Sequence, residues 1–87
     1  MAGPMTPELI EAEILQRTSM TDKSICPSEV ARALEPENWR PLMGAVRLAA
    51  ARLSAAGSIE ILRKGKPIAP EAIHGVIRLR RHRVETQ

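Results

Sequence analysis

Eight basic residues after position 39 have the types and spacing that could do chemistry. They are charged at neutral pH, and their N–H donors suit phosphate oxygens and the edges of guanine bases. Arg40 and Arg47 are seven residues apart, which is two helical turns, so a helix would present them on one stripe. The candidate nucleic-acid-binding residues are Arg40, Arg47, Arg52, Arg63, Lys64, Lys66, Arg78 and Arg80.

Charge is divided unevenly along the chain. Residues 1–38 contain three basic and seven acidic residues, a balance of −4, whereas residues 39–87 contain ten basic and three acidic residues, a balance of +7. The formal net charge of +3 therefore hides a strongly basic second half. Such polarity favours a polyanionic partner and carries no information about sequence specificity.

The stretch from Trp39 to Gly57 is predicted to be the central helix, with residues 41–56 as its body. Pro41 suits the first helical turn and Gly57 suits the left-handed residue that closes a helix. One face is expected to be buried and the other to be small and basic. The predicted core face consists of Leu42, Met43, Val46, Ala49, Ala50 and Leu53, and the outward face of Arg40, Gly44, Arg47, Ala51 and Ala55.

The outward face fits a helix in the major groove of DNA. Gly44 and Ala51 would let the backbone approach, while the arginines reach bases or phosphates and Arg52 flanks them. The alternative is an ordinary solvated face, with Gly44 packed against a neighbouring helix. Leu48 is apolar near this stripe and could contact a thymine methyl group, a neighbouring helix or a second protein.

The other elements frame this helix. Thr6 and Pro7 predict a helix over 7–17 in which Ile10, Ile14 and Leu15 face inward. Residues 18–23 are expected to form a loop, and 24–26 a short extended segment at the edge of a sheet. A second helix begins at Pro27 and ends before Pro36. Helices joined by so short a turn form a helix-turn-helix.

After Gly57 the apolar period changes from 3.6 to 2, which indicates strands. A strand begins at Ile59 and runs into a basic loop at residues 63–67, and 76–81 alternates again, with one helical turn expected within 70–75. The predicted hairpin thus has a long basic tip, whose lysines could contact phosphates. Basic residues also protect exposed sheet edges from aggregation, which is the alternative explanation.

These elements predict a mainly α fold with a small antiparallel sheet: a winged helix-turn-helix of three helices and a β-hairpin wing. The runs CPSEVARAL, NWRPLMGAVRLAAARLSAAG, IEILRKGKPI and GVIRLR resemble a bacterial family of small proteins, a domain of unknown function with a winged-helix-like fold. The resemblance extends over residues 8–81 and implies the fold; it carries no functional residues to this chain. The expected domain spans 7–81, between a disordered lead-in (1–6) and a flexible basic tail (82–87).

Other classes of function have little support. Cys26, His74 and His82 have no metal-ligand spacing, and no catalytic constellation or cofactor motif is present, so we expect neither an enzyme nor a cofactor. One cysteine and no long apolar run indicate a cytoplasmic protein without a membrane anchor. Trp39, the single aromatic residue, favours duplex DNA over single strands, which need several stacking residues. A protein-interaction module or homodimer is the competing hypothesis.

Overall fold

The computed structural model describes residues 5–82 of the chain. Helices occupy the first two thirds of this range and strands the last third, in the predicted order. The elements are α1 (Pro7–Ser19), α2 (Pro27–Leu34), the 3₁₀ turn η1 (Arg40–Leu42), α3 (Met43–Ala55), β1 (Ile59–Arg63), β2 (Lys66–Ile68), the 3₁₀ turn η2 (Pro70–Ala72) and β3 (Arg78–Arg81).

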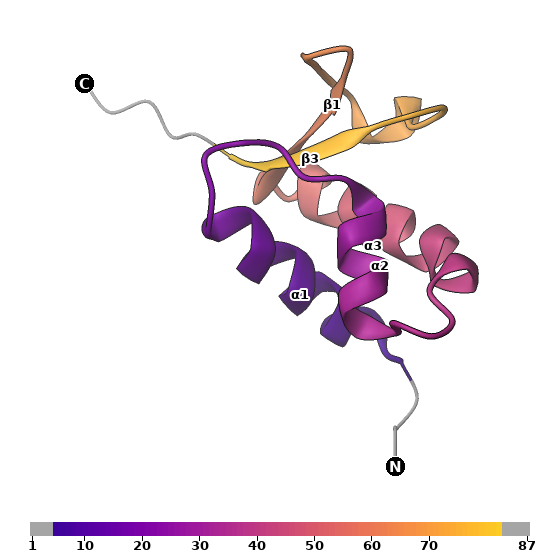
Figure 1. Cartoon of the computed structure of the whole chain (residues 1–87). Coiled ribbons are helices and arrows are strands. Elements are labelled where there is room, and N and C mark those ends of the chain that lie inside the picture. Colours follow the sequence, from indigo (N-terminus) through magenta and orange to yellow (C-terminus); the bar gives the residue numbers. More distant parts are fainter. Residues whose placement is uncertain (1–4, 83–87) are drawn as a thin grey trace.

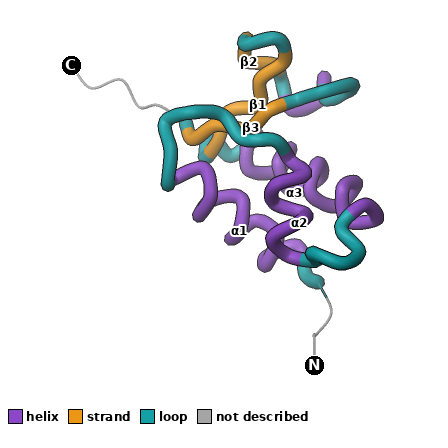
Figure 2. The backbone as a smooth tube through the Cα atoms, viewed as in Figure 1, coloured by secondary structure: helices purple, strands orange, loops and turns teal. Residues whose placement is uncertain are grey.

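The three helices gather on one side of the sheet, and the β1–β2 hairpin projects away from them (Figures 1 and 2). The sheet is antiparallel, with strand order β2-β1-β3. α1 and α2 both pack against α3, and α3 in turn packs against β1. This arrangement confirms the predicted fold of three helices with a small antiparallel sheet and makes α3 the element that joins the two layers.

α1 begins where the sequence predicts, because the hydroxyl of Thr6 accepts a hydrogen bond from the Leu9 amide (3.2 Å). The helix extends two residues beyond the predicted end, to Ser19. In this last turn the buried hydroxyl of Thr18 donates to the carbonyl of Ile14 (2.8 Å), one turn back. The prediction for Leu15 was wrong: its side chain is 40% exposed, and Thr18 occupies the inward position below Ile14 instead.

The short extended segment pairs with the sheet, as predicted. Ile25 forms an antiparallel bridge with Leu79, in which the Ile25 amide donates to the Leu79 carbonyl (2.7 Å) and the Leu79 amide donates back (2.8 Å). β3 therefore lies between β1 and the chain that links α1 to α2. Both side chains belong to the buried core, so this bridge closes the helical layer onto the sheet.

α3 buries the face that its sequence predicts. Val46, Ala49, Ala50 and Leu53 are buried, whereas the predicted outward residues are exposed or half-buried. Pro41 lies in the 3₁₀ turn η1, which leads into α3 and tolerates a residue without an amide hydrogen.

The far end of α3 closes on a left-handed residue. Gly57 adopts φ +82°, its amide donates to Ser54 and the next amide donates to Leu53, so the last carbonyls of the helix are satisfied.

The wing differs from the prediction at its tip. Lys64 (φ 53°) and Gly65 (φ 80°) form a two-residue turn with positive φ at both positions, the geometry that tight hairpins prefer. The residues that follow form β2 rather than a loop, and Pro67 pairs with Leu62. Proline is tolerated because β2 is an edge strand, where a missing amide donor need not weaken the sheet. The proline and the short length obscured this strand in the sequence.

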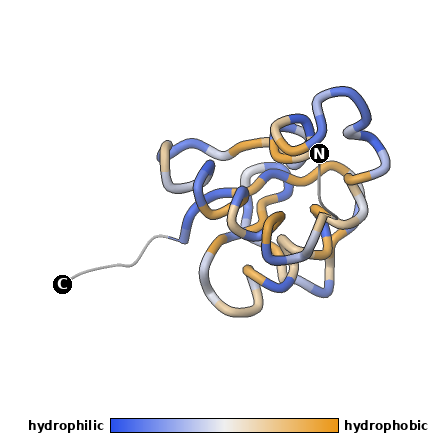
Figure 3. The backbone as a smooth tube through the Cα atoms, turned by 90° about the horizontal axis from the view of Figure 1, so that it is seen from below, coloured by the Kyte–Doolittle hydropathy of each residue, from blue (hydrophilic) through white to orange (hydrophobic). Residues whose placement is uncertain are grey.

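A single aliphatic core holds the two layers together. Isoleucine, leucine, valine and alanine side chains from all three helices and from β1 and β3 form it, and Trp39 packs on its margin. Hydrophilic and hydrophobic residues alternate along the tube in Figure 3, because the helices and strands each have an exposed face. Ile77 and Leu79 point into this core and Arg78 points outward, as the alternation of the last strand predicts.

The predicted lead-in and tail lie mostly outside the described residues. Within the described part, Met5 packs against the core, Thr6 caps α1, and the His82 amide donates to the Ser58 carbonyl (3.4 Å). These three residues are thus attached to the domain.

Two glycines with open surroundings should respond oppositely to alanine. A Cβ atom at Gly44 or at Gly57 would meet no atom within 4 Å, but only Gly57 has a positive φ. We expect Gly44→Ala to raise the free energy of unfolding by about 0.5–1 kcal/mol through helix propensity. Gly57→Ala should lower it by about 1–2 kcal/mol through backbone strain. Urea titration measures both; equal effects of the same sign would contradict this account.

Candidate nucleic-acid interface

The outward face of α3 borders a groove instead of lying fully open. Gly44, Arg47, Leu48 and Ala51 form one side, and Pro70 and Ile73 beyond β2 form the other; the groove encloses about 310 Å³. Gly44 does not pack against another helix, because nothing lies near a Cβ atom at this position. The packing explanation for Gly44 was therefore wrong, and the glycine lies on an exposed face of α3.

Arg47 connects α3 to the loop before β3. Its Nη1 atom donates to the carbonyl oxygen of Gly75 (3.1 Å), and the side chain is half-buried. A carbonyl group orients a guanidinium without cancelling its charge. Arg47 is thus held beside the wing as a cation with further donors to spare.

Arg40 is placed at the corner between α2 and α3, one turn before α3 begins. Its guanidinium carbon lies 4.6 Å from the centre of the Trp39 ring, and that of Arg32 lies 4.4 Å from the same centre. Trp39 is thus both a margin of the core and a platform for two cations. Arg32 is not among the predicted residues; its signal in the sequence is its place on α2, just before the turn that carries Trp39.

Arg63 points back from the end of β1 to the loop before β3. Its Nη1 atom donates to Nε2 of His74 (2.5 Å), and Nδ1 of His74 lies 2.8 Å from the Ala72 carbonyl. Because arginine only donates, His74 accepts at Nε2 and carries its hydrogen on Nδ1. A Cβ atom at Gly75 would lie 3.8 Å from the Arg63 guanidinium, so Arg63 and Arg47 flank the same glycine.

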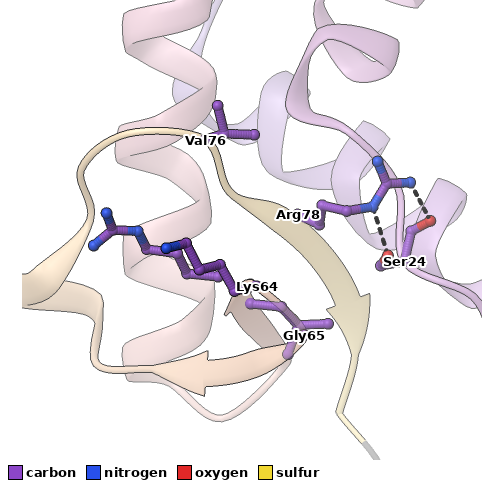
Figure 4. Close-up of a pocket in the computed structure, with 7 residues that line it drawn as sticks. Ser24, Lys64, Gly65, Val76 and Arg78 are labelled. Carbon is purple, nitrogen blue, oxygen red and sulfur yellow. Dashed lines mark hydrogen bonds between the residues drawn. The ribbon is translucent and has the colours of Figure 1, made fainter.

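Lys64 and Lys66 occupy the wing tip and its edge strand. Both are exposed, and within residues 5–82 neither has a hydrogen-bond or ion-pair partner through its side chain. Arg78 lies on β3, which pairs with β1 on the side opposite β2. It donates from Nε to the Ser24 hydroxyl (2.6 Å) and from Nη2 to the Ser24 carbonyl (2.9 Å), as Figure 4 shows. Because Ser24 is neutral, these hydrogen bonds do not offset the positive charge of Arg78.

Two predicted binding residues are neutralised by carboxylates. Nε of Arg52 lies 2.7 Å from Oε2 of Glu11 on α1, and Nη2 of Arg80 lies 2.5 Å from Oε1 of Glu60 across the sheet. Arg81 is likewise paired with Asp22. These arginines connect elements of the fold and contribute little net charge to the surface. Arg52 and Arg80 are consequently the weakest members of the predicted set.

Four of the remaining cations lie around the loop before β3 and the hollow beside the wing. Arg47 and Arg63 meet at Gly75, and Arg63, Lys64 and Arg78 line a common hollow beside the wing. Arg40 lies two helical turns before Arg47. Tertiary folding thus brings together four of the eight predicted residues: Arg47, Arg63, Lys64 and Arg78. Arg40 in η1 and Lys66 on β2 are exposed and, like those four, have no carboxylate partner among residues 5–82.

Other kinds of site have no support within residues 5–82. This part of the chain contains no group of three or more His, Cys, Asp or Glu residues that could hold a metal ion. It contains no helix with the length and apolar character needed to cross a bilayer.

Three helices followed by an antiparallel sheet with a projecting hairpin define the class of winged helix-turn-helix domains. Residues 7–82 match the family described as "Protein of unknown function (DUF3253)", and the chain belongs to this family. A search of curated proteins finds no match. The family assignment agrees with the resemblance expected from the sequence and leaves the activity open.

The two ion pairs should differ in strength because they differ in exposure. The side chains of Arg80 and Glu60 are 28% and 22% exposed, and those of Arg52 and Glu11 are 48% and 29% exposed. In double-mutant cycles to glutamine, we expect a coupling of about 0.5–1 kcal/mol for the first pair and less for the second. Urea unfolding at low and high salt measures both couplings. A larger coupling for Arg52 and Glu11 would contradict this ranking.

Proposed function

We propose that this domain binds duplex DNA through α3 and the wing. One observation carries the proposal: within residues 5–82, six of the predicted cations have no carboxylate partner and four of them lie around the loop before β3 and the wing, whereas Arg52 and Arg80 are neutralised. A surface of this kind attracts the phosphate backbone irrespective of base sequence. The proposal assigns the domain no catalytic step, and cytoplasmic location remains part of the prediction.

The first half of α3 would enter the major groove. Arg40 and Arg47 lie two turns apart and flank Gly44, which has no neighbour within 4 Å of a Cβ position. A glycine at this place lets the helix backbone approach the bases. The second half of the helix is excluded from the contact, because Arg52 is bound to Glu11.

The wing would contact phosphates next to the groove. Lys64 lies at the turn and Lys66 on the edge strand, both exposed, and lysine makes point-charge contacts that suit any sequence. Arg78 is already oriented by Ser24 and would bind a phosphate with the N–H groups that Ser24 leaves free. Glu71 in η2 is exposed near the α3 groove and would limit how deeply that end approaches DNA.

Binding should depend strongly on salt and on the unpaired cations. With about four to six phosphate contacts, the logarithm of the association constant should fall with a slope of about −4 to −5 against the logarithm of salt concentration. Arg47→Gln or Lys64→Gln should each reduce the magnitude of the slope by about one. Fluorescence anisotropy of labelled duplex DNA of random sequence measures these values.

Matched variants separate the interface from net charge. Arg17→Gln removes the same charge from α1, where Arg17 is paired with Glu13 (2.6 Å), and Arg52→Gln removes it from the paired end of α3. Both should change the salt slope much less than Arg47→Gln. Equal effects of all three arginine variants would indicate nonspecific charge attraction, and absence of binding at low salt would refute the proposal.

One observation favours a protein-interaction module as the second candidate. Leu48 is 64% exposed on α3, with the α3 groove on one side and a second apolar hollow, lined by Met5, Pro7, Ile10 and Ala45, on the other. A large apolar side chain between two hollows is the form of a ridge that packs into a partner. The same face cannot then enter DNA.

Self-association and DNA affinity together distinguish the two functions. If Leu48 forms a contact between two copies, light scattering should show a dimer at high protein concentration and a monomer for Leu48→Ser. A dimer alone would not exclude DNA, because paired winged helices read paired half-sites, so DNA affinity decides: if α3 binds DNA, Leu48→Ser should lower it only about threefold or less. A dimer that Leu48→Ser dissociates and that binds no DNA would establish the second candidate.

A further inference from the structure

A hollow of about 420 Å³ lies on the outer face of the sheet, beside the wing. Its walls come from β1, the Lys64–Gly65 turn, the start of β3 and the segment before α2 (Figure 4). This volume falls in the range of sites for small organic molecules. The hollow lies on the side of the sheet that Leu62 faces, and none of its lining residues belongs to the core cluster.

The floor of the hollow is apolar. Leu62 is only 5% exposed, yet it does not belong to the core cluster, because it points away from Ile61 and the helices. Its cross-strand neighbours are Pro67 on β2 and Arg78 on β3. Val76 adds an apolar wall that is 84% exposed to solvent. An apolar molecule placed here would cover Val76 and contact Leu62, and burial of this surface favours binding.

The rim of the hollow is cationic. Arg63, Lys64 and Arg78 line it, and no carboxylate lies among its lining residues. The acidic side chains closest along the same strands and loops are already committed, Glu60 to Arg80 and Asp22 to Arg81. Positive charge thus remains at the wing end of the sheet, while the opposite end is neutralised.

Arg78 is prepared for an anion. Ser24 accepts two of its five N–H groups, one at Oγ and one at the carbonyl, and this fixes the guanidinium plane without neutralising it. Three N–H groups remain. Lys64 stands on a different side of the hollow and has no side-chain partner among residues 5–82, so its ammonium group can move to meet a ligand. A fixed donor with a movable one suits a carboxylate or phosphate group.

We propose that this hollow binds a small organic anion: an apolar ring or branched chain against Leu62 and Val76, with a carboxylate or phosphate group held by Arg78 and Lys64. The site is separate from α3 and shares Lys64 and Arg78 with the proposed DNA-binding surface, but the inference does not require DNA binding. A phosphate without an apolar body would leave the floor unused, and a neutral ring would leave the cations without a partner.

Four probes test the two parts of the site in the absence of DNA. Phenyl phosphate and benzoate have a ring and an anionic group, benzyl alcohol has the ring alone, and inorganic phosphate has the charge alone. In ¹H–¹⁵N correlation spectra of the full chain, the two organic anions should shift the amides of Leu62, Lys64 and Val76 with saturation at roughly millimolar concentration. Benzyl alcohol and inorganic phosphate should bind at least tenfold more weakly.

Variants of the rim test the role of charge. Arg78→Gln should weaken phenyl phosphate binding about tenfold, and Lys64→Gln about threefold. Arg81→Gln is the matched control, because it removes the same group from the same strand but does not line the hollow. If Arg78→Gln loosens the contact with Ser24 and disturbs the fold, Lys64→Gln still decides the question, since Lys64 has no described side-chain partner.

Several results would overturn the inference. Benzyl alcohol that binds as tightly as phenyl phosphate would show an apolar surface without anion recognition. Inorganic phosphate that binds equally would show a charged patch without an organic site. Shifts confined to the α3 groove, no saturable shift with either organic anion, or equal losses in Arg78→Gln and Arg81→Gln would also refute it.

Discussion

The paired hydrogen bonds between Ile25 and Leu79 are the constraint on which the rest of the structure depends. They join two residues 54 positions apart and place β3 between β1 and the chain entering α2. Because Leu79 is fully buried and Ile25 nearly so, the bridge forms together with the core and cannot slip without exposing apolar surface. Every contact between the first loop and the sheet follows from this register.

The same register determines where charge remains. Ser24 precedes the bridge and meets Arg78, whereas Asp22, two residues earlier, meets Arg81. Together with the pair of Glu60 and Arg80, these contacts neutralise the end of the sheet near the helices. The partner of Arg78 is the neutral Ser24, so its positive charge is not offset. The basic second half of the chain is thereby divided into arginines that hold the fold together and cations that face solvent beside the wing.

The surface cations and the apolar features favour different partners. Arg40, Arg47 and the wing lysines suit a long polyanion, and the absence of a neighbour at Gly44 leaves the helix backbone accessible to it. Leu48 suits a protein surface instead, since burying its side chain needs an apolar partner. The hollow over Leu62 fits neither a long polyanion nor a protein surface, because it is small, apolar at its floor and cationic at its rim. Membership of the family does not favour any of these three partners, so the choice among them rests on the residues named above.

The sequence by itself determined the features that depend on neighbours a few residues apart. The cap at Thr6, the buried face of α3, the left-handed Gly57 and the alternation of Ile77, Arg78 and Leu79 all follow from local periodicity and backbone preference. These features were sufficient to predict the fold class and to collect the candidate cations. Leu15 was misplaced because Thr18, one turn from Ile14, can occupy an inward position when its hydroxyl bonds the helix backbone.

Only the tertiary structure decided which cations are paired with carboxylates and which strand pairs with which. Arg52 and Glu11 are 41 residues apart and Arg80 and Glu60 are 20 apart, so no local pattern could reveal that they pair. β2 has three residues, one of which is a proline. Its stability comes from pairing with β1 rather than from its own strand propensity. The physical reason is common to these cases: contacts between distant segments form only when the core fixes the elements that carry them.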